Sequence, residues 1–153
     1  MSIDHRLAEL GLTLPVAAAP VAAYVPAVEI GGMLHISGQI SFDEDGSLIT
    51  GRLGDDMDVE AGVAAAKRCG VMLLAQLEAA LGSLDRVERI VKLGVFVNST
   101  TDFTDQPKVA NGASELMVAV FGEAGRHARS AVGVAALPLG VAVEVDAIVA
   151  IRA

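Results

Sequence analysis

Arg129 and Glu144 are the two residues whose chemistry and surroundings point to a reaction centre. Each lies in a stretch, 128–134 or 141–151, whose alternating pattern predicts a β-strand. An arginine fork can hold a carboxylate through two hydrogen bonds, and a partly desolvated glutamate can orient water and accept a proton. The pair therefore predicts binding of a small carboxylate beside a water-orienting base. A structural ion pair between neighbouring strands is the alternative interpretation.

The two predicted strands each have two distinct faces. In 141–151 the odd positions are all Val, Ala or Ile, whereas Glu144 and Asp146 share the opposite face. In 128–134 the even positions are Ala, Ser or Val, and Arg129 points from the other face. Pro138 lies between the two strands and indicates a turn or loop there. Each strand thus offers one apolar side and one side with a chemically active group.

The composition fits a single domain over residues 1–153. Hydrophobic residues make up 53% of the chain, enough for a core built mainly of Ala, Val and Leu because aromatic residues reach only 3%. So apolar a chain also favours an oligomer that buries leftover apolar surface.

The charge and the cysteine count exclude several classes of function. The net charge is -8, and without a basic run or an aromatic platform we expect no nucleic-acid partner. Cys69 is the single cysteine, and His5, His35 and His127 lack ligand spacing, so we expect neither metal nor cofactor. No signal-peptide pattern or membrane-length apolar stretch is present, which predicts a cytoplasmic protein without a membrane partner.

The elements that must position the pair follow the order β-β-α-β-α-β-β. Alternation predicts strands over 27–30, 33–42, 87–97, 128–134 and 141–151, and helical spacing predicts helices over 59–81 and 107–121. A short helix over 2–10 precedes an extended, proline-containing segment over 12–26, and 43–58 is predicted to be a loop. The pattern is α+β, with one mixed β-sheet and two helices packed on one of its faces.

Two features of the first hairpin bear on a binding site. Gly38 interrupts the second strand, which indicates a bulge or the close approach of another group. Tyr24, the only tyrosine, ends the extended segment just before the hairpin. Either a half-buried aromatic at a strand start or a ligand contact fits Tyr24.

The chain also resembles the Rid family, which is also called YjgF and carries the older label endoribonuclease L-PSP. The resemblance covers residue 20 to the end, so residues 1–20 count as an N-terminal extension. It rests on the order and spacing of Tyr24, Ser37-Gly38-Gln39, Phe96-Val97, Asn111, Ala128-Arg129-Ser130, Leu137-Pro138 and Val143-Glu144-Val145.

The resemblance implies a chorismate-mutase-like fold that assembles as a homotrimer with its sites between subunits. It implies that Arg129 holds the carboxylate of a 2-imino acid and that Glu144 places the water that attacks the imine carbon. The products would be a 2-oxo acid and ammonia, with no cofactor. The same resemblance places Tyr24, Ser37 and Gly38 around the substrate, together with Asn111 and Ala131.

The chain departs from the family pattern at two positions beside Arg129. Ala131 stands where family deaminases commonly have Cys, so only its backbone carbonyl can serve there, and Gly133 stands where Glu is common. The leading hypothesis is a hydrolase of 2-imino or enamine acids. A non-catalytic trimer that binds a small carboxylic acid is the first alternative, and an endoribonuclease, disfavoured by the acidic charge, is the second.

Overall fold

The computed structural model describes residues 2–20 and 22–153, so Met1, and Val21 within the predicted extended segment, lie outside the described residues. Within these residues the chain forms α1 (Ile3–Glu9), β1 (Ala27–Ile30), β2 (Met33–Ile40), α2 (Val59–Leu81), β3 (Val87–Asn98), α3 (Gln106–Phe121), β4 (Ala128–Val134) and β5 (Val143–Ile151). Short 3-10 turns η1 (Leu84–Arg86), η2 (Gly122–Gly125) and η3 (Pro138–Gly140) connect them. The predicted order of strands and helices is confirmed.

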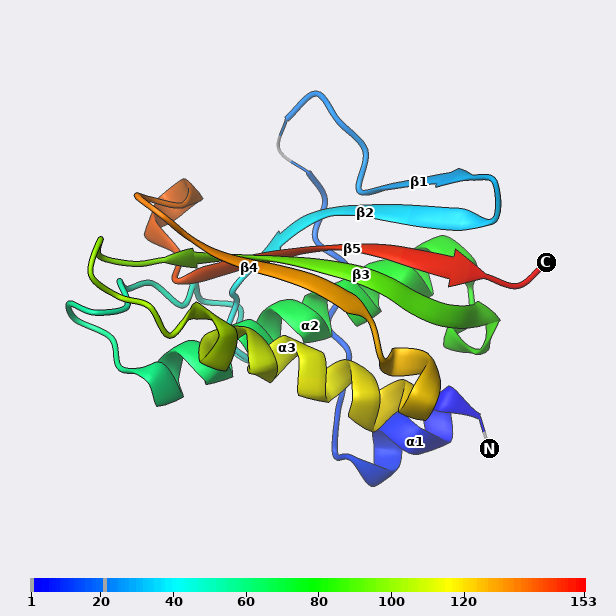
Figure 1. Cartoon of the computed structure of the whole chain (residues 1–153). Helices are drawn as coiled ribbons and strands as arrows, with labels where there is room; N and C mark the ends of the chain where they lie inside the picture. The colour runs from blue at the N-terminus through cyan, green and yellow to red at the C-terminus, as the bar shows by residue number, and fades with distance from the viewer. Residues whose placement is uncertain (1, 21) are drawn as a thin grey trace.

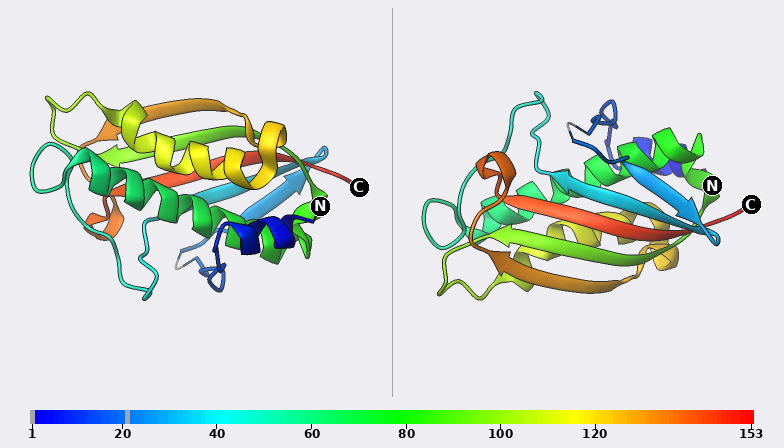
Figure 2. Two further views of the ribbon diagram at one scale, coloured as in Figure 1. Left: turned by 90° about the horizontal axis from the view of Figure 1, so that it is seen from below. Right: turned by 90° about the horizontal axis from the view of Figure 1, so that it is seen from above.

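The five strands form one mixed sheet in the order β1-β2-β5-β3-β4. Only β3 and β4 run parallel, because the helix α3 connects them as a crossover; the other pairs are antiparallel. Both long helices cover the same face of the sheet, and on the opposite face the described residues form no α-helix, only the short turn η3 at one end (Figures 1 and 2). The mixed α+β architecture is therefore confirmed, with the two faces of the sheet in very different surroundings.

The strand β5 lies in the middle of the sheet and defines its two faces. Its odd positions from Val143 to Ile151 are buried against the helices, whereas Glu144 and Asp146 are half-buried on the open face. This is the predicted alternation. The apolar residues of β3 at 93, 95 and 97 are buried on the same side, so the core fills the space between sheet and helices.

The helix α2 begins and ends where its capping residues predict. The side chain of Asp58 accepts a hydrogen bond from the backbone N–H of Ala61 at 2.8 Å. At the other end Gly82 adopts φ +78°, the left-handed conformation that glycine takes without steric cost. Residues 71–77 are all buried, since α2 packs on the sheet and also against α3.

The contact between α2 and α3 depends on Gly112. A Cβ atom at this position would overlap the backbone carbonyl of Val63 on α2 and lie 3.1 Å from the backbone nitrogen of Lys67. Backbone atoms of a buried helix cannot move aside as a flexible side chain can. The absence of a side chain at Gly112 thus sets how closely the two helices approach.

We expect Gly112→Ala to lower the free energy of unfolding by about 2–3 kcal/mol, because overpacking would force the two helices apart. In an exposed helix the same substitution would instead stabilise the protein by up to about 1 kcal/mol. Chemical denaturation checks the sign. Glu115→Ala, on the exposed side of the same helix, is the control and should change stability by less than about 0.5 kcal/mol.

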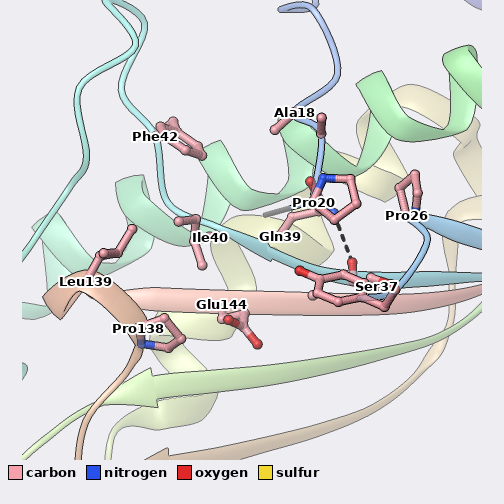
Figure 3. Close-up of a pocket in the computed structure, with 13 residues that line it drawn as sticks. Ala18, Pro20, Pro26, Ser37, Gln39, Ile40, Phe42, Pro138, Leu139 and Glu144 are labelled. Atoms are coloured by element: carbon pink, nitrogen blue, oxygen red, sulfur yellow. Dashed lines mark hydrogen bonds between the residues drawn. The ribbon is translucent and has the colours of Figure 1, made fainter. Parts of the chain in front are cut away.

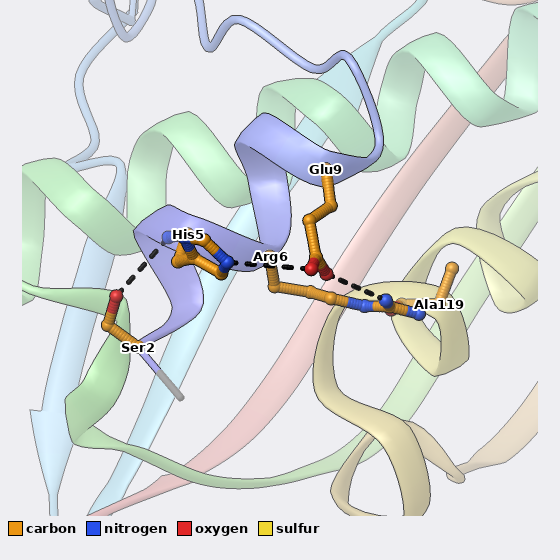
Figure 4. Close-up of polar contacts among 5 residues, drawn as sticks. All are labelled: Ser2, His5, Arg6, Glu9 and Ala119. Carbon is orange, nitrogen blue, oxygen red and sulfur yellow. Dashed lines mark hydrogen bonds and ion pairs between the residues drawn. The ribbon is translucent and has the colours of Figure 1, made fainter.

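The N-terminal helix α1 docks on the end of α3. Ser2 caps α1 by accepting from the N–H of His5, and Leu7 is buried. Arg6 donates from Nε to the carbonyl of Ala119 at 2.8 Å and pairs with Glu9 at 3.1 Å (Figure 4). The chain then leaves the helix layer and passes the sheet to its open face before β1 begins (Figure 1).

Candidate active site

A cavity of about 370 Å³ lies on the open face of the sheet above β2 and β5 (Figure 3). Its walls come from the N-terminal segment, from β2 and the residues that follow it, from η3 and from β5. They are formed by Ala18, Ala19, Pro20, Tyr24, Pro26, Ser37, Gly38, Gln39, Ile40, Phe42, Pro138, Leu139 and Glu144. Tyr24, Ser37, Gly38 and Glu144, all predicted site residues, are therefore brought together around one cavity.

A bulge in β2 allows the carboxylate of Glu144 to lie against the neighbouring backbone. The register between β2 and β5 shifts between Ile36 and Gln39, so Ser37 and Gly38 have no pairing partners on β5. A Cβ atom at Gly38 would stand 2.5 Å from Oε2 of Glu144. The prediction that Gly38 marks a bulge and a close approach is confirmed, and the group that approaches is Glu144.

The surroundings of Glu144 favour its neutral form. Burial raises the pKa of its carboxyl above the usual value, and the nearby carboxylate of Asp146 adds to the effect. No donor from the described residues forms a hydrogen bond to this carboxylate, so both oxygens remain available to a water or a ligand. A desolvated glutamate with a raised pKa, at the wall of a cavity, is well suited to accept a proton.

Ser37 fixes the chain that carries Tyr24. Its hydroxyl donates to the carbonyl of Val25 at 2.8 Å, and its backbone N–H donates to the carbonyl of Pro26 at 2.9 Å. The ring of Tyr24 is held just before this anchor and stays about half exposed, at 52%. The hydroxyl proton of Ser37 is thus used in a hydrogen bond to the backbone, so toward a ligand in the cavity its oxygen can only accept.

Arg129 lies on the other side of the sheet, on the edge strand β4. In the register Arg129 pairs with Leu93, which is fully buried under the helices. Its Nη1 donates to Oδ1 of Asn111 at 2.8 Å and to Oγ of Ser114 at 3.1 Å, and its Nη2 donates to the carbonyl of Pro107 at 3.3 Å. All three acceptors are neutral groups of α3.

These bonds leave one edge of the guanidinium available. Both protons of Nη1 and one proton of Nη2 are used, so Nε–H and the second Nη2–H remain. These two groups form the side-on fork that grips a carboxylate. Among the described residues no carboxylate forms an ion pair with Arg129. The guanidinium is held in place without being neutralised, as a carboxylate receptor requires.

The expectation that Arg129 lies beside Glu144 is wrong within a single chain. The strand β3 lies between β4 and β5, and Glu144 pairs with Phe96 on the open face, opposite to the buried Leu93. The connection η3 brings β5 back into the centre of the sheet rather than beside β4. A structural ion pair of Arg129 with Glu144 within one chain is excluded by the same geometry.

Comparison with known proteins decides the family. A family described as "YjgF/chorismate_mutase-like, putative endoribonuclease" matches residues 4–149 of the chain. The chain belongs to the YjgF family.

Relatives of this YjgF chain carry different names. Protein TCP17 of Trypanosoma cruzi is 56% identical over 148 residues, which cover 96% of this chain and 92% of TCP17. The 2-iminobutanoate/2-iminopropanoate deaminase of Dermatophagoides farinae is 29% identical over 142 residues, covering 92% of this chain and 95% of that protein. A crystal structure of an Agrobacterium tumefaciens protein of unknown function shares 48% identity, with a TM-score of 0.91, and covers 98% of this chain and 92% of that one.

Two predicted residues lie beside Arg129 rather than around the cavity. Asn111 is the guanidinium acceptor described above. Ala131 follows Arg129 at the next position on the same face of β4, pairs with Val95 and packs against the core. The predicted site residues of this YjgF chain therefore form two groups on opposite faces of the sheet.

The residues that hold Arg129 in this YjgF chain include two that sequence reasoning missed. Oγ of Ser114 lies 2.8 Å from Nε2 of His127, whose Nδ1 lies 2.6 Å from the carbonyl of Gly125. A carbonyl only accepts, so Nδ1 carries the proton, and in the neutral ring Nε2 accepts from Ser114. The spacing of Ser114 from the predicted Asn111, three residues along one helix face, is a signal that could have found Ser114 but not His127.

Residues 2–20 and 22–153 contain no group of three His, Cys, Asp or Glu side chains placed to hold a metal ion. None of the helices in the same part of the chain combines the length and the hydropathy that crossing a membrane requires.

Proposed function

We propose that this YjgF-family protein hydrolyses reactive 2-imino and enamine acids to 2-oxo acids and ammonia, without a cofactor, at sites between the subunits of a homotrimer. The observation that carries the proposal is the pairing of two incomplete half-sites. The Glu144 cavity holds a base, but none of its lining residues carries a positive charge. Arg129 offers an unoccupied carboxylate fork on the edge strand β4.

Assembly through the open face of the sheet would unite the two half-sites. Register and alternation place Val28, Ile30 and Val132 on this face, and they are 50%, 68% and 46% exposed. Leu139 of η3, beside the cavity, is 72% exposed. Uncovered apolar side chains on a sheet face without helices favour contact with another copy of the chain. Arg129 of one subunit would then reach the Glu144 cavity of its neighbour.

The chemistry follows from the two groups. The fork of Arg129 holds the substrate carboxylate, which fixes the imine carbon next to it at the Glu144 carboxylate. Glu144 takes a proton from a water molecule as the water oxygen bonds to the imine carbon. Glu144 passes this proton to the imine nitrogen, which gives a carbinolamine. Glu144 then moves the proton of the new hydroxyl group to the amine nitrogen, so the C–N bond breaks and ammonia leaves as the carbonyl forms. One imine and one water give one 2-oxo acid and one ammonia.

The role of Ser114 in holding the guanidinium of Arg129 can be tested by substitution. We expect Ser114→Ala to raise KM about 3- to 10-fold with a smaller effect on kcat, because the variant removes one neutral acceptor that orients the guanidinium. Steady-state kinetics on an imine made from alanine measure both constants. Glu115→Gln, the exposed neighbour on the same helix, is the control. An unchanged KM for Ser114→Ala would contradict the role given to Ser114.

The direct test measures ammonia release from imines that an amino-acid oxidase generates from alanine, leucine and phenylalanine. The proposal predicts release faster than the spontaneous hydrolysis seen without the protein. No acceleration with any of the three would overturn it. In that case, binding of 2-oxo acids that disappears in Arg129→Ala would favour the non-catalytic carboxylate-binding trimer. RNA cleavage that persists in variants of Arg129 and Glu144 would reflect another site or a contaminant.

A further inference from the structure

We propose that the cavity selects substrates with bulky apolar side chains, and that Gln76 is a positioning residue that holds the wall responsible for this selection. The inference rests on the proposed function, since it concerns the substrate of the same site. It goes beyond that function because it assigns a side-chain class and a role to a residue of α2 that does not touch the reacting atoms.

The chemistry of the cavity differs between its two parts. Ser37 and Glu144 supply the polar groups near the bulge of β2. The remaining walls are largely apolar and come from Ala18, Pro20, Pro26, Ile40, Phe42, Pro138 and Leu139 (Figure 3). A volume of about 370 Å³ exceeds what a carboxylate, an imine carbon and one water need. The surplus space is bounded by apolar atoms, which favour an apolar group over water.

One apolar wall is a segment without helix or strand that Gln76 pins in place. Nε2 of Gln76 donates to the carbonyl of Ala18 at 2.7 Å and to Oε1 of Gln39 at 3.3 Å. Gln39 in turn donates from Nε2 to the carbonyl of Ser37 at 3.0 Å (Figure 3). Two buried amides thus connect the wall at Ala18 with the bulge beside Glu144.

The other end of the segment is tied to the same bulge. The hydroxyl and the N–H of Ser37 bond the carbonyls of Val25 and Pro26, as described above. Ala18 and Val25 are therefore two anchored points among the described residues 12–20 and 22–26, and next to the first of them Pro20 restricts its own backbone dihedral. The lining residues Ala18 and Pro26 are thus held by hydrogen bonds of the protein itself, so a fitting side chain does not have to order them.

Gln76 stands out in α2 because every other residue from Val71 to Leu77 is apolar and the whole run is buried. A buried amide costs stability unless its hydrogen bonds are made, and here both N–H groups are used on the wall and its anchor. A purely structural amide is the competing explanation. The two explanations differ in one measurable property, because only a positioning role changes the choice between substrates.

The test compares kcat/KM for the imine made from leucine with kcat/KM for the imine made from alanine. The wild-type ratio is expected to favour leucine roughly 10- to 100-fold, since each buried methylene contributes roughly fourfold. Gln76→Leu, which keeps the volume but loses both donors, should reduce this ratio roughly 5-fold or more. Lys67→Gln, on the exposed side of α2, is the matched control and should keep the ratio. A wild-type ratio near one, or a ratio that Gln76→Leu leaves intact, would overturn the inference.

Two further measurements keep the result decisive. If Gln76→Leu does not fold, Phe42→Ala tests the apolar wall from the other side and should also lower the leucine-to-alanine ratio; an unchanged ratio would count against the inference. Calorimetric binding of 4-methyl-2-oxopentanoate and pyruvate does not require turnover. If the protein shows no turnover but binds the larger acid more tightly, the lack of turnover refutes the proposed function and the binding preference supports the selectivity of the cavity. Equal binding of the two acids, or no binding, would refute the selectivity.

Discussion

Arg129→Ala is expected to lower kcat/KM for imine hydrolysis about 30- to 1,000-fold. The variant removes the cation that we propose binds the substrate carboxylate. Loss of a hydrogen-bonded charge partner weakens transition-state binding by about 2–4 kcal/mol. Arg129→Lys keeps the charge but loses the planar fork, so we expect an intermediate loss. Ammonia release from oxidase-generated imines gives kcat/KM for the wild type and for both variants.

Arg126 supplies the control for this prediction. Arg126 is exposed, three residues before Arg129, and pairs with Glu123 at 3.1 Å. Arg126→Ala changes the net charge by the same amount, and its kcat/KM should stay within about twofold because exposed pairs contribute little. Equal losses in both variants would mean that the total charge, rather than the fork of Arg129, attracts the substrate. Wild-type activity in Arg129→Ala would contradict the assignment altogether.

The fold followed closely from local patterns. The helix over 59–81 has the predicted bounds because Asp58 and Gly82 cap it through contacts between near neighbours. The alternation of β5 predicted which side chains are buried, since one face of a central strand must pack on the helices. Gly38 indicated a close approach because a glycine weakens a strand and is found there mainly at a bulge or where another group comes near the backbone.

The arrangement of the site did not follow in the same way, because it depends on strand order rather than on any local pattern. Nothing in residues 128–151 shows that β3 separates β4 from β5, so the sequence predicts Arg129 and Glu144 as one adjacent pair. The cavity walls at Ala18 and Leu139 come from segments without periodicity. Among the residues that hold these walls, Gln76 carries a local signal, because it is a polar residue within an apolar helical run.

Glu144→Gln is expected to lower kcat about 100- to 10,000-fold, the usual range for a lost general base. The amide keeps the size of the side chain beside Gly38 but cannot accept the proton of water. Glu88→Gln, an exposed carboxylate on β3, is the control and should retain kcat. Retention of kcat by Glu144→Gln would show that another group activates the water.

The raised pKa of Glu144 predicts how activity depends on pH. The base works only when ionised, so kcat/KM should fall as the pH drops through the raised pKa of this carboxyl. Because the carboxylate of Asp146 contributes to that rise, Asp146→Asn should move the acidic limb of the profile to lower pH. A limb that does not move would mean that the profile reports a different group.

The same shift has a consequence for stability. A carboxyl whose pKa is higher in the folded than in the unfolded state contributes stability at low pH, and this contribution is lost as the pH rises through the folded-state value. At a pH above the folded-state pKa the ionised Glu144 therefore costs stability, and there Glu144→Gln should melt at a higher temperature than the wild type. An inactive variant that is also more stable separates loss of the base from loss of the fold.

A mixture of the two inactive variants tests whether the half-sites meet between subunits. A site that takes Arg129 from one subunit and Glu144 from the next is intact where a Glu144→Gln subunit supplies the arginine and an Arg129→Ala subunit supplies the glutamate. Random assembly of equal amounts, by refolding the two together, makes roughly a quarter of the interfaces intact. Activity should therefore return to roughly that fraction of the wild-type value. Since the two groups lie on opposite faces of one sheet, a mixture that stays inactive while assembling as a trimer would contradict the shared site.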